Sequence, residues 1–489
     1  MRLRSLLSQF DPAIDLAGVP DVEITGLHDD SRRIVRGNLF IARPGTHADG
    51  AQFISDAQQR GASAILTQTL NPSVSLPQVV IPDIASRASR LANIFHGEPS
   101  AEIKVIGITG TNGKTTTAYL VRHILGHVQK RCGMIGTVEI DDGANRHEAQ
   151  LTTPGAVDVA ELLGTMRRNR CAACAMETSS HALAQNRVSG VRFAGAGFTN
   201  LTGDHLDYHK TMDAYAAAKA TLFTSLSPDA VAVVNIDDPH YEKLIARCGC
   251  RIVTFGIRNR ADYHAASFSV TAQGSRYQLN APDGSTEIAL QLVGRHNIEN
   301  SLCAIAICCE LFGLSVSQVA AALRTAPGAP GRLQPVQAGQ AFAVLVDYAH
   351  TDDALRNVLS ALRPLTRGTL RLVFGCGGDR DRTKRPRMAK VAEQLADCVY
   401  VTSDNPRTED PHGIIQEIMS GFSIENTKSI VIEPDRRRAI EHAIGESEPG
   451  DVVLLAGKGH ENYQIVGAIK HHFDDVEEAT RAITAAARA

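Results

Sequence analysis

Short apolar runs alternate with helix-type segments along most of the chain. In the first hundred residues, such runs predict strands at 22–24, 39–41, 64–66 and 79–81. Farther along, the pattern predicts strands at 103–108, 171–177, 194–198 and 230–235, and helices at 114–126, 157–168, 213–226 and 297–312. This alternation is typical of parallel sheets with crossover helices, so the predicted fold class is α/β.

Two segments rich in Pro and Gly divide the chain. They lie at 97–100 and 326–331, and each is typical of a linker. We therefore predict three domains: a small N-terminal α/β domain at 1–98, a central parallel-sheet P-loop ATPase domain at 99–331, and a Rossmann-like α/β domain at 332–489. In the last domain, apolar runs predict strands at 341–347, 370–375, 398–402 and 451–455, each followed by a polar loop. A length of 489 residues also suggests about three domains.

A Gly-rich turn follows the first predicted strand of the central domain. It contains Gly110, Thr111, Asn112, Gly113, Lys114, Thr115 and Thr116. Strand, turn and helix in this order form a phosphate-binding loop, in which backbone N–H groups and a lysine surround a polyphosphate and a hydroxyl reaches Mg²⁺. The Walker pattern has a further Gly five residues before Gly113, where this chain has Ile108, so the loop is a variant.

Acidic and histidine side chains follow two more strands of the same domain. Glu177 ends one strand, at a position where a magnesium ligand often stands beside a P-loop. The loop after the next strand carries Asp204, His205, Asp207 and His209, which is denser in ligand types than a random loop.

Two further features remain ambiguous from the residues alone. Lys219, in a strongly helical segment, is most simply a solvated lysine. Asn297 and Asn300 could equally contact a purine or cap a helix.

Four polar loops end the strands predicted in the third domain. They carry Asp347, then the Gly-rich stretch up to Arg385, then Asp404–Arg407, and finally Gly457–Glu461. The carboxyl ends of parallel strands meet at one edge of a sheet, where ligands bind. Arginines that can hold carboxylates, together with acidic groups that can accept from an ammonium, suit a zwitterionic amino acid.

Composition excludes several other classes of protein. Fifty basic and 53 acidic residues give a net charge of −3, without the basic excess of a nucleic-acid-binding protein. No apolar run reaches the ~18 residues of a membrane span, and polar residues interrupt the N-terminal segment too early for a signal peptide. The ten cysteines are scattered, so we expect free thiols and a cytoplasmic protein.

These motifs together resemble the Mur ligases, the ATP-dependent amino-acid ligases of bacterial peptidoglycan synthesis. The resemblance covers nearly the whole chain and explains the variant P-loop. The signatures at 204–209, 347–351, 375–381 and 457–461 are similar to those of the ligase that adds the third peptide residue. Asp404-Asn405-Pro406-Arg407 resembles the version that selects meso-diaminopimelate.

The resemblance implies a C–N bond-forming reaction. UDP-N-acetylmuramoyl-L-alanyl-D-glutamate, ATP and meso-diaminopimelate would give the UDP-tripeptide, ADP and phosphate through an acyl phosphate, with Mg²⁺ as cofactor. The enzyme would be a cytoplasmic monomer with no nucleic-acid partner.

The resemblance also implies a role for each matching residue. The catalytic group is Lys114, Lys219, Glu177 and His205. The metal ligands are Thr115, Glu177, His205 and Lys219, the last as a carbamate (N6-carboxylysine). ATP is bound by residues 110–116 with Asn297, Arg332 and Asp347. The UDP-substrate is bound by Ser31, Thr46, His47, Ala48, Thr152, Thr153, Ser179, Gln185 and Arg187. Diaminopimelate is bound by Arg385, Asp404, Asn405, Pro406, Arg407, Gly457 and Glu461.

Two other functions stay open at this point. A folylpolyglutamate-type ligase shares the loop and the general architecture, but the full set of C-terminal signatures argues against it. A non-catalytic P-loop switch would not need Glu177, His205 and Lys219 together.

Overall fold

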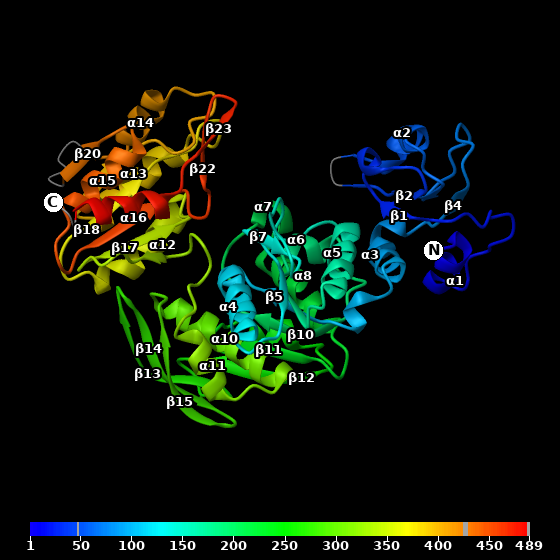
Figure 1. Ribbon diagram of the computed structural model, residues 1–489, viewed down its shortest axis with the longest axis horizontal. Helices are drawn as coiled ribbons and strands as arrows, with labels where there is room; N and C mark the ends of the chain where they lie inside the picture. Colours follow the sequence, from blue (N-terminus) through cyan, green and yellow to red (C-terminus); the bar gives the residue numbers. More distant parts are fainter. Residues whose placement is uncertain (46–47, 424–428, 487–489) are drawn as a thin grey trace. The chain divides into compact units, whose positions relative to one another are not determined.

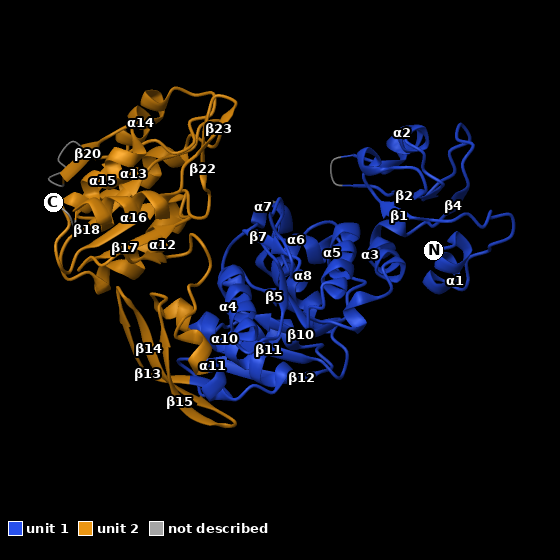
Figure 2. Cartoon of the chain, in the orientation of Figure 1, with its two compact units in different colours: residues 1–264, 299–319 blue, residues 265–298, 320–489 orange. Residues whose placement is uncertain are grey.

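The computed structural model describes residues 1–45, 48–423 and 429–486. Two residues of the predicted UDP-substrate site, Thr46 and His47, lie outside these ranges. The fold is mixed α/β, as the hydrophobic pattern predicted (Figure 1). Two compact units divide the chain, residues 1–264 with 299–319 and residues 265–298 with 320–489 (Figure 2). The predicted three-domain division remains a prediction.

A four-stranded parallel sheet forms the N-terminal part of the first unit. Its order is β1 (Gly26–His28), β2 (Asn38–Ala42), β3 (Ala64–Thr67) and β4 (Gln78–Val80), and its helices are α1 (Leu3–Phe10), α2 (Ile54–Gln59) and α3 (Ile84–Phe95). The predicted strand at 22–24 is wrong. That segment instead lies along the chain's first residues, where Leu3 N donates to Val22 O (2.9 Å) and Ile24 N to Met1 O (2.8 Å).

The larger sheet of the first unit carries the phosphate-binding loop. In order it contains β12 (Arg251–Gly256), β11 (Val231–Asn235), β10 (Phe193–Phe198), β5 (Lys104–Thr109), β9 (Ala173–Glu177), β6 (Cys132–Ile135), β7 (Glu139–Asp141) and β8 (Arg146–Glu148). The first six are parallel, and β7 and β8 extend the edge antiparallel. The carboxyl ends of β5, β9 and β10 therefore share one edge, which is where α/β sheets bind ligands.

The helices of this part are α4 (Lys114–His127), α5 (Ala156–Arg168), α6 (Ser180–Ala184), α7 (Leu206–His209), α8 (Met212–Thr224) and α9 (Tyr241–Ile245). Three of these six helices, α4, α5 and α8, match predicted segments, and the short helices α6, α7 and α9 were not predicted. Strand β13 (Tyr263–Thr271) starts beside β12 and continues into the second unit, whose hairpin is β14 (Gly274–Ala281) and β15 (Gly284–Leu290). Helix α10 (Arg295–Phe312) leads back to the first unit, and α11 (Val316–Leu323) follows.

A six-stranded sheet forms most of the second unit. Its order is β16 (Gln334–Val336), β17 (Ala343–Asp347), β21 (Val452–Ala456), β18 (Leu370–Phe374), β19 (Cys398–Val401) and β20 (Ser429–Ile432), with all but β16 parallel. The helices are α12 (Asp352–Leu362), α13 (Lys384–Leu395), α14 (Pro411–Met419), α15 (Arg436–Gly445) and α16 (Asp475–Ala486). Two more strands, β22 (Tyr463–Val466) and β23 (Ile469–His472), pair with each other.

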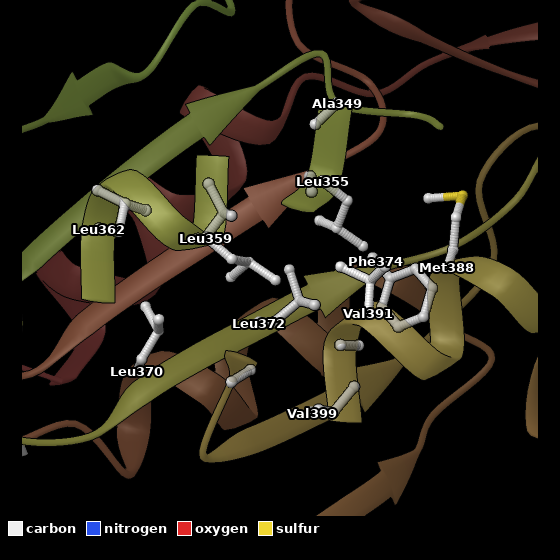
Figure 3. Close-up of a cluster of buried hydrophobic side chains, with 14 of the residues drawn as sticks. Ala349, Leu355, Leu359, Leu362, Leu370, Leu372, Phe374, Met388, Val391 and Val399 are labelled. Atoms are coloured by element: carbon white, nitrogen blue, oxygen red, sulfur yellow. The ribbon is translucent and has the colours of Figure 1, made fainter. Parts of the chain in front are cut away.

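Apolar side chains bury both faces of this sheet. On one face, Leu355 and Leu359 from α12 pack near Leu372 and Phe374 of β18 (Figure 3). Burial on both faces explains why the strands are near-continuous apolar runs and could be predicted from the sequence. Within the described part of the chain, no helix is both long enough and apolar enough to cross a membrane.

Candidate active site

The phosphate-binding loop is the turn between β5 and α4. Gly110 and Gly113 have φ of 150° and 85°, conformations that L side chains rarely adopt. A Cβ on Gly110 would collide with the Thr199 hydroxyl, and one on Gly113 would collide with the Asn300 side chain. Glycine is thus required at both positions for steric as well as conformational reasons. The N-terminus of α4 adjoins this loop, and the dipole of the helix favours an anion there.

Two lysines lie folded onto this loop. Lys114 Nζ donates to the carbonyls of Gly110 and Thr111, each at 2.8 Å, and Lys219 Nζ donates to Gly110 O at 2.9 Å. Lys219 is almost fully buried on α8 and lies 4.5 Å from the Tyr215 ring centroid. Burial first, and the Lys114 charge second, hold the pKa of Lys219 well below its usual value. A solvated lysine, the simplest interpretation of the sequence, is therefore wrong.

Glu177 is fully buried at the end of β9, with three donors around its carboxylate. Thr115 Oγ1 donates at 2.9 Å, Thr137 Oγ1 at 3.0 Å and the Thr137 backbone N–H at 2.8 Å. Thr137 was not predicted, because nothing in its local pattern marks it. A carboxylate and a hydroxyl beside a phosphate loop are oxygen ligands of the kind that Mg²⁺ prefers.

His205 and its neighbours form an aromatic group at the end of the following strand. His205 has φ of 53° and its ring centroid lies 4.9 Å from that of His181, while His209 is buried with Nε2 2.9 Å from the Ser180 hydroxyl. Among the described residues, no three or more His, Cys, Asp or Glu side chains gather as a metal site would require. The predicted ligand set also includes Thr115 and a modified Lys219, which are outside those residue types.

Four of the residues predicted for the UDP-substrate lie near the end of β9. Thr153 Oγ1 donates to Glu177 O (2.7 Å) and accepts from Ser179 N (3.1 Å). Arg187 donates to Thr153 O (2.8 Å) and to Gln185 Oε1 through Nε (3.0 Å) and Nη2 (2.6 Å).

The remaining predicted residues of this site are more scattered. Thr152 Oγ1 accepts from Thr137 Oγ1 at 3.1 Å, which connects it to the Glu177 cluster. Ser31 is buried in the N-terminal sheet region, and Ala48 is exposed.

Three residues predicted near the nucleotide belong to the second unit. Asn297 Nδ2 donates to Val293 O at 2.9 Å. The Asp347 carboxylate accepts from Leu333 N (2.7 Å) and Ala349 N (2.9 Å), and burial raises its pKa. The Arg332 guanidinium carbon lies 5.3 Å from the Tyr348 ring centroid.

A second polar group lies at the carboxyl ends of β19 and β21. Asn405 Nδ2 donates to Glu461 Oε2 at 2.8 Å, and Gly457 leaves room for the buried Asp404 carboxylate. Burial, followed by the charge of Asp404, raises the pKa of Glu461. Lys458, which was not predicted, lies with Nζ 3.9 Å from Glu461 Oε2 and supplies a buried positive charge. The group can therefore accept from an ammonium while its own charges are partly balanced.

The two predicted arginines of this site differ in their surroundings. Arg385 is fully buried, and its Nη atoms donate to the carboxylates of Glu409 (2.8 and 2.9 Å) and Glu417 (2.8 Å) and to Gly377 O (3.1 Å). Arg407 is half-buried, has φ of 53°, and uses one Nη1–H on Gly378 O (2.8 Å). A guanidinium carries five N–H donors, so Arg407 keeps more of them for a ligand. Pro406 connects Arg407 to Asn405.

Three domain families match the chain in succession. "Mur ligase family, catalytic domain" matches residues 23–101, "Mur ligase middle domain" 108–308, and "Mur ligase, glutamate ligase domain" 331–459. The chain is 43% identical to the UDP-N-acetylmuramoyl-L-alanyl-D-glutamate--2,6-diaminopimelate ligase of Gloeobacter violaceus, over 99% of this chain and 98% of the relative. It is also 43% identical to the ligase of that name from Geobacillus kaustophilus, over 99% of both.

A solved structure carries the same ligase name and superposes on this fold. The TM-score is 0.74, at 34% identity and 98% coverage of both chains. Similarity in sequence over almost the full length and similarity in fold thus agree. This chain belongs to the Mur ligase family.

Proposed function

We propose that this chain is the ATP-dependent ligase that joins meso-diaminopimelate to UDP-N-acetylmuramoyl-L-alanyl-D-glutamate. The observation that carries the proposal is the pair of sites at strand ends. One is a phosphate loop with Lys114 and Lys219. The other is the set of buried Asp404 and Asn405 and half-buried Glu461, next to Arg407. The second set has the charges that a zwitterion with an extra carboxylate requires.

The chemistry proceeds in two balanced steps. The D-glutamate side-chain carboxylate attacks the γ-phosphorus of ATP, the bond to ADP breaks, and an acyl phosphate forms. The neutral amine of diaminopimelate then attacks the acyl carbon, phosphate leaves with the C–O electron pair, and the amine loses a proton. The protein supplies position and charge rather than a covalent intermediate.

Lys114 and the loop provide the charge for the first step. When a polyphosphate enters, its oxygens can replace the carbonyls that Lys114 now contacts, so the ammonium moves from Gly110 and Thr111 onto developing negative charge. Thr115 and Glu177 would hold Mg²⁺, which when bound neutralises phosphate charge. Thr115 Oγ1 and Glu177 Oε2 are hydrogen-bonded at 2.9 Å, and both are oxygen ligands of the kind that fits this role.

Lys219 is the residue that we propose to be carbamylated. Carbon dioxide adds only to a neutral amine, and the lowered pKa of Lys219 favours that form. The product carries one negative charge and two oxygens in place of an ammonium, which suits a neighbouring cation. His205 would be the fourth ligand of the metal, together with Thr115, Glu177 and the modified Lys219.

The proposal also includes the cellular location and the oligomeric state of the enzyme. We expect a cytoplasmic enzyme, because all ten cysteines are free thiols. We expect a monomer, because one chain carries every group that the two steps need.

Phosphate release provides the test. We expect release only when the UDP-dipeptide, ATP and meso-diaminopimelate are all present, with lysine a poor replacement for the last. A Lys114→Met variant serves as the control for contaminating ATPase activity. Equal turnover without the UDP-dipeptide would identify a simple ATPase. Preference for a folyl substrate would favour the folylpolyglutamate-type ligase instead.

A further inference from the structure

The two-stranded ribbon β22–β23 has little support of its own. It forms a separate sheet of two strands, and every residue of β23 is exposed. Isolated hairpins of this kind are only marginally stable in water. A cavity of about 410 Å³ also lies against it, lined in part by Ser403, Pro406, Gln464 and Val466. Apolar packing therefore does not explain why the ribbon is held in place.

Hydrogen bonds hold β22 to the loop that carries the acceptor site. Gln464 Nε2 donates to Asp404 O at 2.6 Å, and Ile465 N donates to Asn405 Oδ1 at 2.9 Å. The same Asn405 side chain donates to Glu461. The ribbon thus contacts two of the residues that we assign to the amino acid.

The ribbon also fixes both backbone groups of Arg407. Arg407 N donates to Ile465 O at 3.0 Å, and Gly467 N donates to Arg407 O at 2.7 Å. Arg407 has φ of 53°, a left-handed conformation that residues with a side chain seldom adopt. Two hydrogen bonds with the ribbon therefore maintain a backbone conformation that the loop would not prefer alone. That conformation directs the guanidinium to Gly378 O.

We propose that the ribbon at 463–472 is the positioning element of the acceptor site, with Gln464 and Gly467 as positioning residues. By holding Asp404–Arg407, they set the affinity for the acceptor and its selection by Arg407. Neither residue needs to touch the substrate. The inference rests on the proposed function, because it takes diaminopimelate as the acceptor.

The first test is Gln464→Met, which keeps the side-chain length and removes the donor. Loss of one hydrogen bond corresponds to about a 2- to 12-fold change. We expect KM for meso-diaminopimelate to rise by that factor, and the ratio of kcat/KM between meso-diaminopimelate and lysine to fall. The KM for ATP and the KM for the UDP-dipeptide should not change. Gln464→Lys retains a hydrogen-bond donor, so its KM for meso-diaminopimelate and its selectivity should stay closer to those of the unaltered enzyme.

A second variant changes the turn of the ribbon, where Gly467 N donates to Arg407 O in the Asp404–Arg407 loop. Gly467 has φ of 60° and open space around its Cα, so Gly467→Ala introduces backbone strain without a collision. It should give the same selective rise in KM for meso-diaminopimelate. His471→Ala, on the exposed strand β23, is the matched control and should leave all three KM values unchanged.

The outcomes separate this inference from the proposed function. If the unaltered enzyme does not use meso-diaminopimelate at all, the proposed function fails. If it does, and both variants keep their KM and their selectivity, the ribbon is not a positioning element. An equal rise in all three KM values, or an equal effect in His471→Ala, would also overturn the inference, because it would indicate a general loss of structure.

Discussion

Replacing Asp475 by Asn tests the most deeply buried ion pair of the second unit. Arg436 and Asp475 have no exposed side-chain surface, and they meet through Nε–Oδ1 at 2.8 Å and Nη2–Oδ2 at 2.6 Å. The substitution keeps the shape of the side chain and leaves the Arg436 charge without its hydrogen-bonded counter-ion. Removing one partner of such a pair costs about 3–5 kcal/mol of unfolding free energy.

The expected change is large enough for routine thermal unfolding. For a unit of this size, about 2–4 °C of Tm corresponds to each kcal/mol, which gives a loss of about 6–20 °C. The matched control is Glu287→Gln, which breaks the exposed pair with Arg276 in the same unit and should change stability by less than about 0.5 kcal/mol. Circular dichroism during heating, together with urea unfolding, measures both.

A double variant separates charge from shape. Apolar residues of similar volume often replace a buried ion pair at little cost, so Arg436→Met with Asp475→Leu should recover much of the loss. The reasoning is refuted if Asp475→Asn costs less than about 1 kcal/mol, or if it costs no more than Glu287→Gln. Failure of the double variant to improve on Asp475→Asn would show that hydrogen-bond geometry, rather than the unpaired charge, dominates.

Three further outcomes are expected. Arg407→Met should lower kcat/KM for meso-diaminopimelate by roughly 10- to 150-fold, as for loss of charged hydrogen bonds, and should narrow the gap to lysine; unchanged discrimination would place selectivity elsewhere. Lys219→Ala should nearly abolish phosphate release, with partial recovery on addition of short carboxylic acids, and full activity would contradict the carbamate. Hydrogen bonds from Arg385 lower the pKa of Glu409 from 4.5 to about 2. The stabilisation from Glu409 is therefore complete above pH 4.5 and is lost as the pH falls toward 2, so Glu409→Gln should flatten unfolding curves measured over that range.

Local pattern was sufficient for the buried strands at the centre of the parallel sheets. Strands such as β5, β9 and β18 are buried on both faces, so their sequences are continuous apolar runs that can be recognised without tertiary information. The segment Val22-Glu23-Ile24 was also predicted to be a strand. It did not become a strand of the sheet because its backbone groups pair with the first residues of the chain.

The contacts between distant residues could not be predicted in this way. The position of Glu177 at a strand end was visible, but its partner Thr137 lies forty residues earlier in an unremarkable turn. Arg385 was visible as a charge near a strand end. Its burial against Glu409 and Glu417 depends on a loop and a helix that follow later in the chain. Charge alone does not identify which opposite charge a side chain will meet.

The ribbon β22–β23 is a similar case. Its short strands are half-buried or exposed, so they lack the apolar signal of the sheet strands. Its contacts with the Asp404–Arg407 loop bridge about sixty residues, mostly through backbone groups, which every sequence possesses. The assignment of individual site residues to ligands remains a prediction.

The chain passes between its two compact units three times, at 264/265, 298/299 and 319/320. A fragment beginning at residue 332 would therefore lack part of the second unit. Ala272 and Val293 belong to the same buried cluster as Leu345 and Leu372, and such a fragment would expose the surface that they cover. We expect a protease cut at any one crossing to yield two pieces that remain associated, because each cut leaves the two segments of at least one unit on different pieces. Reassembly of separately produced fragments is accordingly a more promising route to isolating this region than truncation.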